Sequence, residues 1–561
     1  MKNFTVSCFI LILVIACTSQ PETIIPEWIP YDESEQVAEY AENESRRMRY
    51  KQIQSQVSDK NDLWKSIADQ ISVFSEEDYH RLTPFIYELD IPTIQAHVQS
   101  GDLSYVELTQ WYLYRIAKFE NNNETMTNSI IALNPNAVEQ ARALDRKRSK
   151  TNHLIYGMPV LLKDNINAEE MPTTAGTYLL RDNIADDAFI TKQLEDHGAI
   201  ILGKTNLSEW ANFLFLGGPN GFSAVGGQTL NAYGRGVFDT GGSSSGSGVA
   251  MAMNYATVAV GTETSGSILS PSSQSSLVGL KPTIGLLSRG GIVPLSSTLD
   301  TPGPMTRSVI DNAILLSAMT GKDASDTASI EQSDNSDYIE IAKNGSLKGI
   351  RFGVDTRRLS NPLYAAQIEI IKANGGIPVE FDPIEIEFQG FGDMLSADMR
   401  IDLPAYLEQY ASDSIKERTM KEIVAYNLED SLLRIPYGQG RFEAASNVEF
   451  TPDELAEIKE SLNQEAIRFF ETPMQALNLD VILTINNWGA GYAAAAKYPC
   501  LTVPMGYTDE GQPMGLTFVG RPFEEAKLLG IGYAYEQATK ARKAPELNHS
   551  IKGIAPEDST R

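Results

Sequence analysis

Apolar runs of strand length alternate with amphipathic helical patterns along most of this chain, and that alternation restricts the folds it can adopt. The runs MPVLL (158–162), AIIL (199–202) and NYATVAVG (254–261) are separated in part by the helical pattern AFITKQLEDHG (188–198). The same alternation returns after Ser346, and it is typical of βαβ units. We therefore expect an α/β fold, with a mixed and mostly parallel sheet flanked by helices on both faces.

Patterning and composition predict four parts along the chain. Residues 1–16 have the layout of a signal peptide, and residues 17–89 are polar and acidic enough for a tether with a helical extension. Residues 90–545 carry the alternating pattern, interrupted at about 393–465 by a charged stretch that we interpret as an inserted helical region. Residues 546–561 form a polar tail.

One helix start is marked with particular clarity. Ser104 precedes Glu107 by three residues, and apolar residues at helical spacing follow. This order is a capping box, in which each of the two side chains satisfies a free backbone amide of the first turn. We expect a helix to begin there.

The acidic charge argues against nucleic acid as a partner. The 561 residues contain 46 Lys and Arg against 73 Asp and Glu, a formal charge of −27 that repels phosphate backbones. With 42% hydrophobic residues the chain has enough apolar material for a large core. The sequence leaves the oligomeric state open.

The first residues predict export. One lysine is followed by the apolar run Phe9 to Ala16, too short to span a bilayer, and then by Cys17. The residues ahead of Cys17 resemble a bacterial lipobox, so we expect lipidation at Cys17 and a protein of the bacterial cell envelope that meets the membrane only through that anchor. A plain cleaved signal and an uncleaved anchor are the alternatives. Removal of Cys8 with the signal would leave Cys500 without a disulfide partner.

Two motif matches are misleading. GAIILGKT (198–205) fits the phosphate-loop pattern, but its variable positions are apolar and read as a strand, whereas a phosphate loop needs an exposed turn of backbone amides. GSSSG (242–246) fits a nucleophile elbow centred on Ser244, which requires an acid and then a histidine further along the chain. The only later histidine is His549, in the polar tail. We therefore expect neither nucleotide binding nor a histidine-based triad.

A serine nucleophile without histidine needs another base, and lysine is the known substitute. The SxxK spacing is absent, so the lysine must come from elsewhere. Lys163 ends the apolar run in GMPVLLKDN, where open α/β sheets present functional groups. Burial there disfavours the ammonium form and lowers the lysine pKa, and a neutral amine accepts a proton.

These residues carry a resemblance to the amidase signature family. GMPVLLKDN matches its lysine motif through Lys163, and GGSSSGSGVA matches its glycine-serine motif through Ser243. GTETSGSILSP matches its nucleophile motif through Ser267, which is 24 positions from Ser243, as in the family. The resemblance covers roughly residues 90 to 540.

The resemblance implies a Ser-Ser-Lys hydrolase that cleaves linear amides through an acyl-serine intermediate. Ser267 would be the nucleophile, Ser243 a bridging serine preceded by a cis peptide bond, and Lys163 the base. The backbone amides of Thr264, Ser265, Gly266 and Ser267 would form the oxyanion hole. No cofactor is implied, and the absence of a Cys/His cluster with zinc-ligand spacing favours a metal-free enzyme.

Departures from the commoner family motif indicate a branch. Glu263 replaces Asp, Ser265 replaces Gly and Leu269 replaces Arg, a combination that resembles the bacterial peptide amidases. That likeness predicts a small-molecule or peptide amide substrate, with C-terminally amidated peptides preferred. Three alternatives remain: a subunit that transfers ammonia to misacylated transfer RNA, an esterase or aryl-acylamidase using the same triad, and a catalytically inactive binding lipoprotein.

Overall fold

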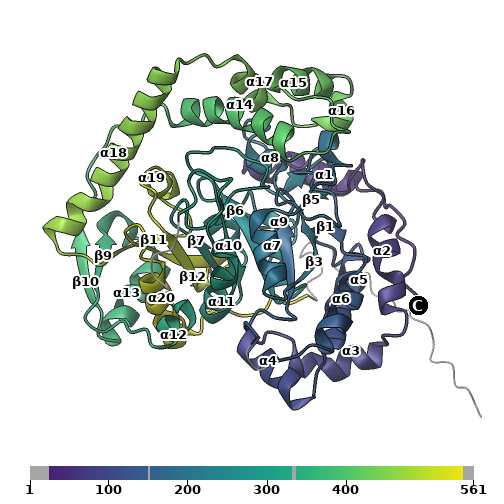
Figure 1. The fold of residues 1–561 in the computed structure, drawn as a ribbon. Coiled ribbons are helices and arrows are strands. Elements are labelled where there is room, and N and C mark those ends of the chain that lie inside the picture. The colour runs from purple at the N-terminus through teal and green to yellow at the C-terminus, as the bar shows by residue number, and fades with distance from the viewer. Residues whose placement is uncertain (1–23, 150–151, 331–336, 548–561) are drawn as a thin grey trace, which may run out of the picture.

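One sheet of eleven strands organises the molecule (Figure 1). The computed structural model describes residues 24–149, 152–330 and 337–547. The predicted signal peptide, the lipidation site Cys17 and nearly all of the polar tail lie outside these residues. Within the described ranges, no helix has both the length and the apolar character needed to cross a membrane.

The strands follow each other across the sheet in the order β1-β3-β2-β6-β8-β7-β12-β13-β11-β9-β10. In that order they span Ile130–Leu133, Ile200–Thr205, Pro159–Lys163, Val258–Glu263, Thr301–Thr306, Val278–Lys281, Cys500–Tyr507, Pro513–Val519, Val481–Ile485, Arg351–Asp355 and Ile377–Phe381. A separate two-stranded sheet pairs β4 (Phe222–Ser223) with β5 (Gly227–Gln228).

The sheet is mixed, as expected, and parallel pairing is confined to two blocks. One block is β3-β2-β6 and the other is β11-β9-β10. The strands between the blocks pair antiparallel, and so does the edge strand β1. Parallel pairs therefore form a smaller share of the strand pairs in the large sheet than the alternation of apolar runs and helices indicated.

Strands β12 and β13 show why the central strands pair antiparallel. A tight turn, in which the Thr508 amide donates to the Gln512 carbonyl at 2.9 Å, joins them, and so short a connection permits only antiparallel pairing.

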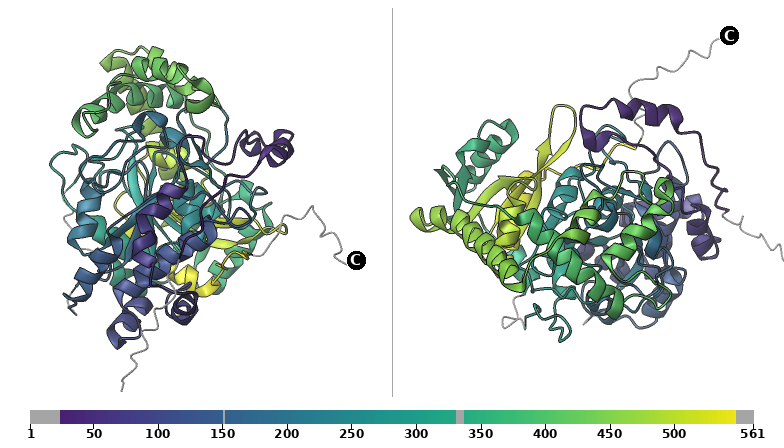
Figure 2. Two further views of the ribbon diagram at one scale, coloured as in Figure 1. Left: turned by 90° about the vertical axis from the view of Figure 1, so that its right-hand side faces the viewer. Right: turned by 90° about the horizontal axis from the view of Figure 1, so that it is seen from above.

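Helices cover both faces of the sheet, which confirms the predicted fold class (Figure 2). On one face lie α9 (Ser245–Ala252) and α10 (Leu269–Gln274), which pack against each other and against the central strands. The opposite face is covered by the helices α7, α11, α12, α13 and α20, which span Phe189–Asp196, Val309–Met319, Tyr338–Lys343, Pro362–Ala373 and Glu525–Thr539. The C-terminal end of β6 lies beside the N-terminal end of α9. The two serine motifs, which occupy these ends, are therefore adjacent, and the Ser244 amide donates to the Ser267 carbonyl at 3.2 Å.

The N-terminal helices lie on the β1 side of the sheet, in the purple and blue part of the ribbon in Figure 1. They are α1 to α6, at Ser34–Ala41, Asn61–Ile71, Glu76–Leu82, Ile91–Ser100, Tyr105–Glu120 and Ala137–Asp145. Helix α5 begins where the capping box predicted: the Glu107 amide donates to Ser104 Oγ at 3.1 Å, and the Ser104 amide donates to Glu107 Oε2 at 2.9 Å.

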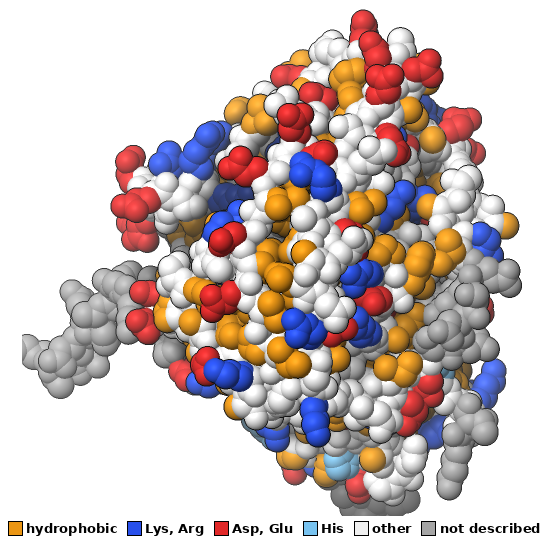
Figure 3. Space-filling model, turned by 90° about the vertical axis from the view of Figure 1, so that its left-hand side faces the viewer, with side chains coloured by type: hydrophobic (Ala, Val, Ile, Leu, Met, Phe, Trp, Pro, Cys, Tyr) orange, Lys and Arg blue, Asp and Glu red, His pale blue; other side chains and the backbone are white. Residues whose placement is uncertain are grey.

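A further set of helices lies across the top of the molecule and, with α18, down its left side in Figure 1. These are α14 to α18, at Phe391–Gln409, Met420–Leu428, Ser431–Arg434, Gly440–Asn447 and Pro452–Ala476. Shorter elements complete the fold: α8 (Glu209–Asn212), α19 (Ala490–Ala495), and the 3-10 helices Arg46–Met48, Thr83–Phe85, Tyr178–Leu180 and Thr356–Arg358. On the side that carries β10 and α18, exposed apolar side chains lie among charges of both signs (Figure 3).

Candidate active site

Lys163 ends β2, a strand whose five residues are all buried. Its side chain is fully inaccessible to solvent. The Lys163 Nζ atom donates to Ser243 Oγ at 2.8 Å, to Thr262 Oγ1 at 2.8 Å and to the Thr262 carbonyl at 3.2 Å. The lysine therefore makes three polar contacts with two residues, and one of these residues is the serine predicted to bridge to the nucleophile.

Burial lowers the pKa of Lys163 to about 7, although the carboxylates of Asp300 and Glu263 act in the opposite direction. The cause is desolvation, because an ammonium group loses hydration that the interior replaces only in part. Near neutral pH a large fraction of the Lys163 side chain is therefore an uncharged amine, able to accept a proton.

Ser243 lies just before α9, and the Gly242–Ser243 peptide bond is cis, as the resemblance implied. The Ser243 carbonyl accepts from the Ser208 amide at 3.0 Å. The next amide, that of Ser244, donates to the Ser267 carbonyl at 3.2 Å. A backbone hydrogen bond thus joins the two serine loops.

The loop from Thr264 to Ser267 is held by the buried carboxylate of Glu263. Glu263 accepts from the amides of Gly266, Ile268 and Leu269 at 2.6, 2.7 and 3.0 Å. Gly266 has φ +86°, a left-handed conformation that glycine adopts without steric cost. The carboxylate and the glycine together turn the chain sharply between β6 and α10.

One of the four backbone amides predicted to form the oxyanion hole, that of Gly266, is already hydrogen-bonded within the protein. Because the Gly266 amide donates to Glu263, it does not point to an open acceptor site in this arrangement. No hydrogen bond among the described residues uses the amides of Thr264, Ser265 or Ser267. Ser267 is 9% exposed, so little of this residue is in contact with solvent.

The structure brings Lys163, Ser243 and Ser267 close together, but it contains only one of the two hydrogen bonds that the predicted proton transfer requires. The Lys163–Ser243 hydrogen bond is present. Of the hydrogen bonds between described residues, none joins Ser243 Oγ to Ser267 Oγ. The catalytic roles of the three residues remain predictions.

Three residues near the lysine escaped the sequence-based assignment. Thr262 supplies two of the three Lys163 contacts, and Asn165 Nδ2 donates to Thr262 Oγ1 at 3.1 Å. Asp300 accepts from Thr264 Oγ1 at 2.5 Å, and burial raises the pKa of its carboxyl group. Thr262 lies inside the quoted nucleophile motif, yet threonine carries no distinctive chemical signal, so only its position in space reveals the contact.

Lys204 explains why the phosphate-loop match is misleading. Residues 200–205 form strand β3, and Lys204 is fully buried, with its Nζ atom 3.0 Å from Asp164 Oδ1. This lysine is paired inside the protein and presents no loop of free amides. Within the described ranges, no group of three or more His, Cys, Asp or Glu side chains is arranged to hold a metal ion.

The three amide contacts of Glu263 lead to a prediction. We expect Glu263→Gln to lower the free energy of unfolding by about 1–3 kcal/mol, because a neutral amide accepts through one oxygen and its NH₂ group opposes the remaining donors. The loop that carries Ser267 should shift as well, lowering kcat/KM for amides by about 10- to 100-fold. Thermal unfolding and amide kinetics measure both effects, with the exposed Glu510→Gln as the matched control. Unchanged stability and kinetics would show that the carboxylate does not hold the loop.

Comparisons with known proteins identify the class. The family model for amidases matches residues 107–529. The fold aligns with the crystal structure of an amidase family protein from Bacillus anthracis at a TM-score of 0.83 and 39% identity, covering 89% of this chain and 100% of that one. Peptide amidase from Stenotrophomonas maltophilia aligns at a TM-score of 0.78 and 36% identity, covering 83% and 100%. A probable amidase from Arabidopsis thaliana is 34% identical, covering 82% of this chain and 92% of the relative.

Fold and sequence together therefore define an amide hydrolase. The chain belongs to the amidase signature family, which confirms the resemblance carried by its three motifs.

Proposed function

We propose that this amidase hydrolyses linear carboxamides through an acyl-serine intermediate, with Ser267 as nucleophile, Ser243 as proton bridge and Lys163 as base. The observation that carries the proposal is the contact between Lys163 Nζ and Ser243 Oγ, 2.8 Å long and made by a fully buried lysine. A pKa lowered to about 7 makes that amine a competent base at neutral pH.

The reaction proceeds in two balanced halves. Ser267 Oγ attacks the amide carbonyl carbon while its proton passes to Ser243 Oγ, and the Ser243 proton passes to Lys163 Nζ. The same route returns a proton to the amide nitrogen, the C–N bond breaks and ammonia or an amine leaves. Water then attacks the acyl-serine by the same steps and releases the carboxylate. The relay requires Ser243 Oγ and Ser267 Oγ to approach in the substrate complex, where catalytic hydrogen bonds commonly tighten.

Backbone amides would stabilise the oxyanion. We assign this role to the amides of Thr264, Ser265 and Ser267, since Glu263 already binds the Gly266 amide. Gly266 would join them only if that bond broke. Each oxyanion donor is typically worth about 2.7–4 kcal/mol in the transition state.

The proposed substrates are C-terminally amidated peptides. The motif departures at Glu263, Ser265 and Leu269 support this choice, together with the similarity to a protein described as peptide amidase. The test is ammonia release from amidated dipeptides, compared with the matching methyl esters, anilides and small primary amides. We expect ammonia and carboxylate in equal amounts from peptide amides, without any added protein partner.

Other outcomes of this panel would redirect the assignment. Cleavage of esters alone would indicate an esterase, and preferential cleavage of anilides an aryl-acylamidase. Ammonia release that depends on a partner subunit would indicate an amidotransferase.

We also propose that the protein is exported and lipid-anchored at Cys17 on the bacterial cell envelope. The apolar run that ends at Cys17 supports this placement. Metabolic labelling with a fatty-acid probe tests it: label should enter the wild type and not Cys17→Ala, and an unlabelled wild type would rule out the anchor.

A further inference from the structure

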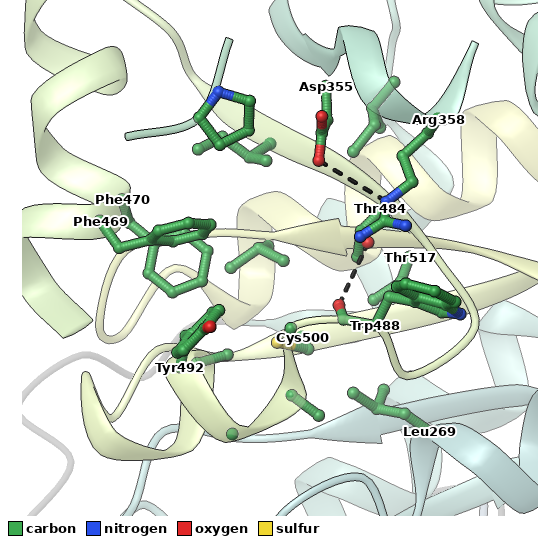
Figure 4. A pocket seen from close by; sticks show the side chains of 18 of the residues that line it. Leu269, Asp355, Arg358, Phe469, Phe470, Thr484, Trp488, Tyr492, Cys500 and Thr517 are labelled. Carbon is green, nitrogen blue, oxygen red and sulfur yellow. Dashed lines mark hydrogen bonds and ion pairs between the residues drawn. The ribbon is translucent and has the colours of Figure 1, made fainter. Parts of the chain in front are cut away.

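A cavity of about 390 Å³ lies between α18, α19 and the ends of β9 and β11 (Figure 4). Its walls are mainly apolar and aromatic: Leu269, Phe381, Phe469, Phe470, Tyr492 and Cys500 contribute to them. Charged side chains line it at one place only, the segment from Asp355 to Arg358. Such a volume suits the acyl part of a small substrate.

The cavity shares a wall with the loop that carries Ser267. Leu269 lines it and follows Ser267 by two residues. Ala490 and Gly491 line it as well, and both lie against the loop. A Cβ atom built on Gly266 would be 3.5 Å from Ala490 Cβ, and one built on Gly491 would be 3.7 Å from Ser265 Oγ. A group held in the cavity would therefore lie beside the loop that carries the proposed nucleophile.

Two arginines line the cavity, and they differ in the hydrogen bonds that their guanidinium groups donate. Arg357 donates to both carboxylate oxygens of Asp355, with Nε–Oδ1 3.0 Å and Nη2–Oδ2 2.8 Å. Arg358 Nε lies 3.6 Å from Asp355 Oδ2, which is beyond hydrogen-bonding distance. That contact is an ion pair, but no hydrogen bond from the Arg358 side chain to any described residue is present, and its buried Nε atom has no hydrogen-bond partner.

Arg358 is nevertheless held in place. Its guanidinium carbon lies 3.9 Å from the centre of the Trp488 ring, and the Trp488 backbone is held where its carbonyl accepts from Thr484 Oγ1 at 3.1 Å. Figure 4 shows Arg358 reaching from the Asp355 side of the cavity toward Thr484 and Trp488. Stacking on an aromatic face leaves the in-plane N–H groups of a guanidinium available to a ligand.

The charges around the cavity do not balance. Two arginines face one aspartate, and the other lining residues are uncharged. Asp355 forms ion pairs with both arginines, so one negative charge is shared between two positive ones and a net positive charge remains at Arg358, whose side chain is 21% exposed. A guanidinium that makes no hydrogen bond and carries a net positive charge at the edge of an apolar cavity favours a carboxylate, which accepts two parallel hydrogen bonds.

We propose that this cavity is an acyl subsite in which Arg358 binds a carboxylate, so that the enzyme prefers amides whose acyl part carries a carboxylate beyond an apolar spacer. Monoamides of dicarboxylic acids and peptide amides with an acidic residue belong to this class. The inference rests on the proposed function, because it assumes that the acyl group is attacked by Ser267.

The test compares straight-chain dicarboxylic monoamides of increasing length with uncharged amides of the same length. We expect wild-type kcat/KM to favour the charged substrate by about 10- to 100-fold at the best length, the usual worth of hydrogen bonds to charged groups. Arg358→Gln should reduce this ratio to about one, mainly by lowering kcat/KM for the charged amide. Arg358→Lys should keep part of the preference, since it keeps the charge without the paired donors.

The control is Lys497→Gln, which removes one exposed positive charge just beyond α19 without touching the cavity. It should leave the ratio unchanged. An enzyme that hydrolyses both series equally well, or an Arg358→Gln variant that keeps the preference, would overturn the inference.

Binding of the dicarboxylic acids themselves separates this inference from the proposed function. Calorimetry should detect binding to the wild type that Arg358→Gln weakens by about tenfold or more. If the wild type hydrolyses none of the amides but binds the dicarboxylic acids in this Arg358-dependent way, the subsite stands and the proposed function fails. Equal binding to both proteins, or none, would remove the subsite even in an active enzyme.

Discussion

Ser267→Ala should lower kcat/KM for amide hydrolysis by about a thousandfold or more, because the variant lacks the hydroxyl on which the proposed acyl intermediate forms. The backbone amides proposed for the oxyanion stay in place, so substrate binding should change much less than turnover. Steady-state kinetics on a primary amide measure the loss, and thermal unfolding checks that the variant is folded. Ser270→Ala, three residues further along in α10, is the matched control and should remain active.

A fluorophosphonate probe examines the same serine without turnover. It should attach to Ser267 in the folded wild type and leave Ser267→Ala unlabelled. A wild type that resists the probe and hydrolyses no substrate would favour an inactive binding protein. A Ser267→Ala variant with normal activity would place the nucleophile elsewhere.

Lys163→Met should cause a comparable loss of kcat/KM, about a thousandfold or more, because the proton from the nucleophile then has no acceptor. Lys163→Arg should be equally impaired, since guanidinium keeps the positive charge but does not release a proton in a protein. Methionine fills a similar volume in a fully buried site, so the fold should persist. Circular dichroism verifies the fold, and amide kinetics measure the loss.

The pH profile of the wild type tests the same lysine. The base acts in its unprotonated form, and its pKa is lowered to about 7. Wild-type kcat/KM should therefore be low below pH 7, rise through about pH 7 and level off above it. A rate that falls as pH increases through this range, or a Lys163→Arg variant with normal activity, would contradict the proton route.

Ser243→Ala should impair turnover in the same way, since Ser243 is the only described serine to which the Lys163 side chain is hydrogen-bonded.

Local pattern was sufficient for several features of this protein. The capping box at Ser104 and Glu107 predicted where α5 begins, since both partners lie within one helical turn. The apolar run that ends at Lys163 predicted a strand with a buried lysine at its end, and β2 has that form. The apolar variable positions of GAIILGKT also showed correctly that this segment is a strand. Each of these features depends on residues within a few positions of one another in the sequence, so the local spacing of polar and apolar residues is enough to predict it.

Other features depended on residues far apart in the chain. Antiparallel strands between the two parallel blocks depend on which strands meet across the sheet, and helix–strand alternation does not encode that order. Thr262, 99 positions from Lys163, became a partner of the lysine only when β6 paired beside β2. The Gly266 amide was expected to be free, but the carboxylate of Glu263 folds back to bind it.

The sequence by itself determined the family, the residue types of the site and the secondary structure that carries them, because these are written in short motifs and in the period of apolar residues. Only the tertiary structure decided which amides remain available and which side chains meet the charged groups. Arg358 and Trp488 illustrate the difference: they come from separate segments and meet at 3.9 Å in the folded protein. Burial, desolvation and hydrogen-bond satisfaction are properties of all the groups around an atom, and distant segments supply most of those groups.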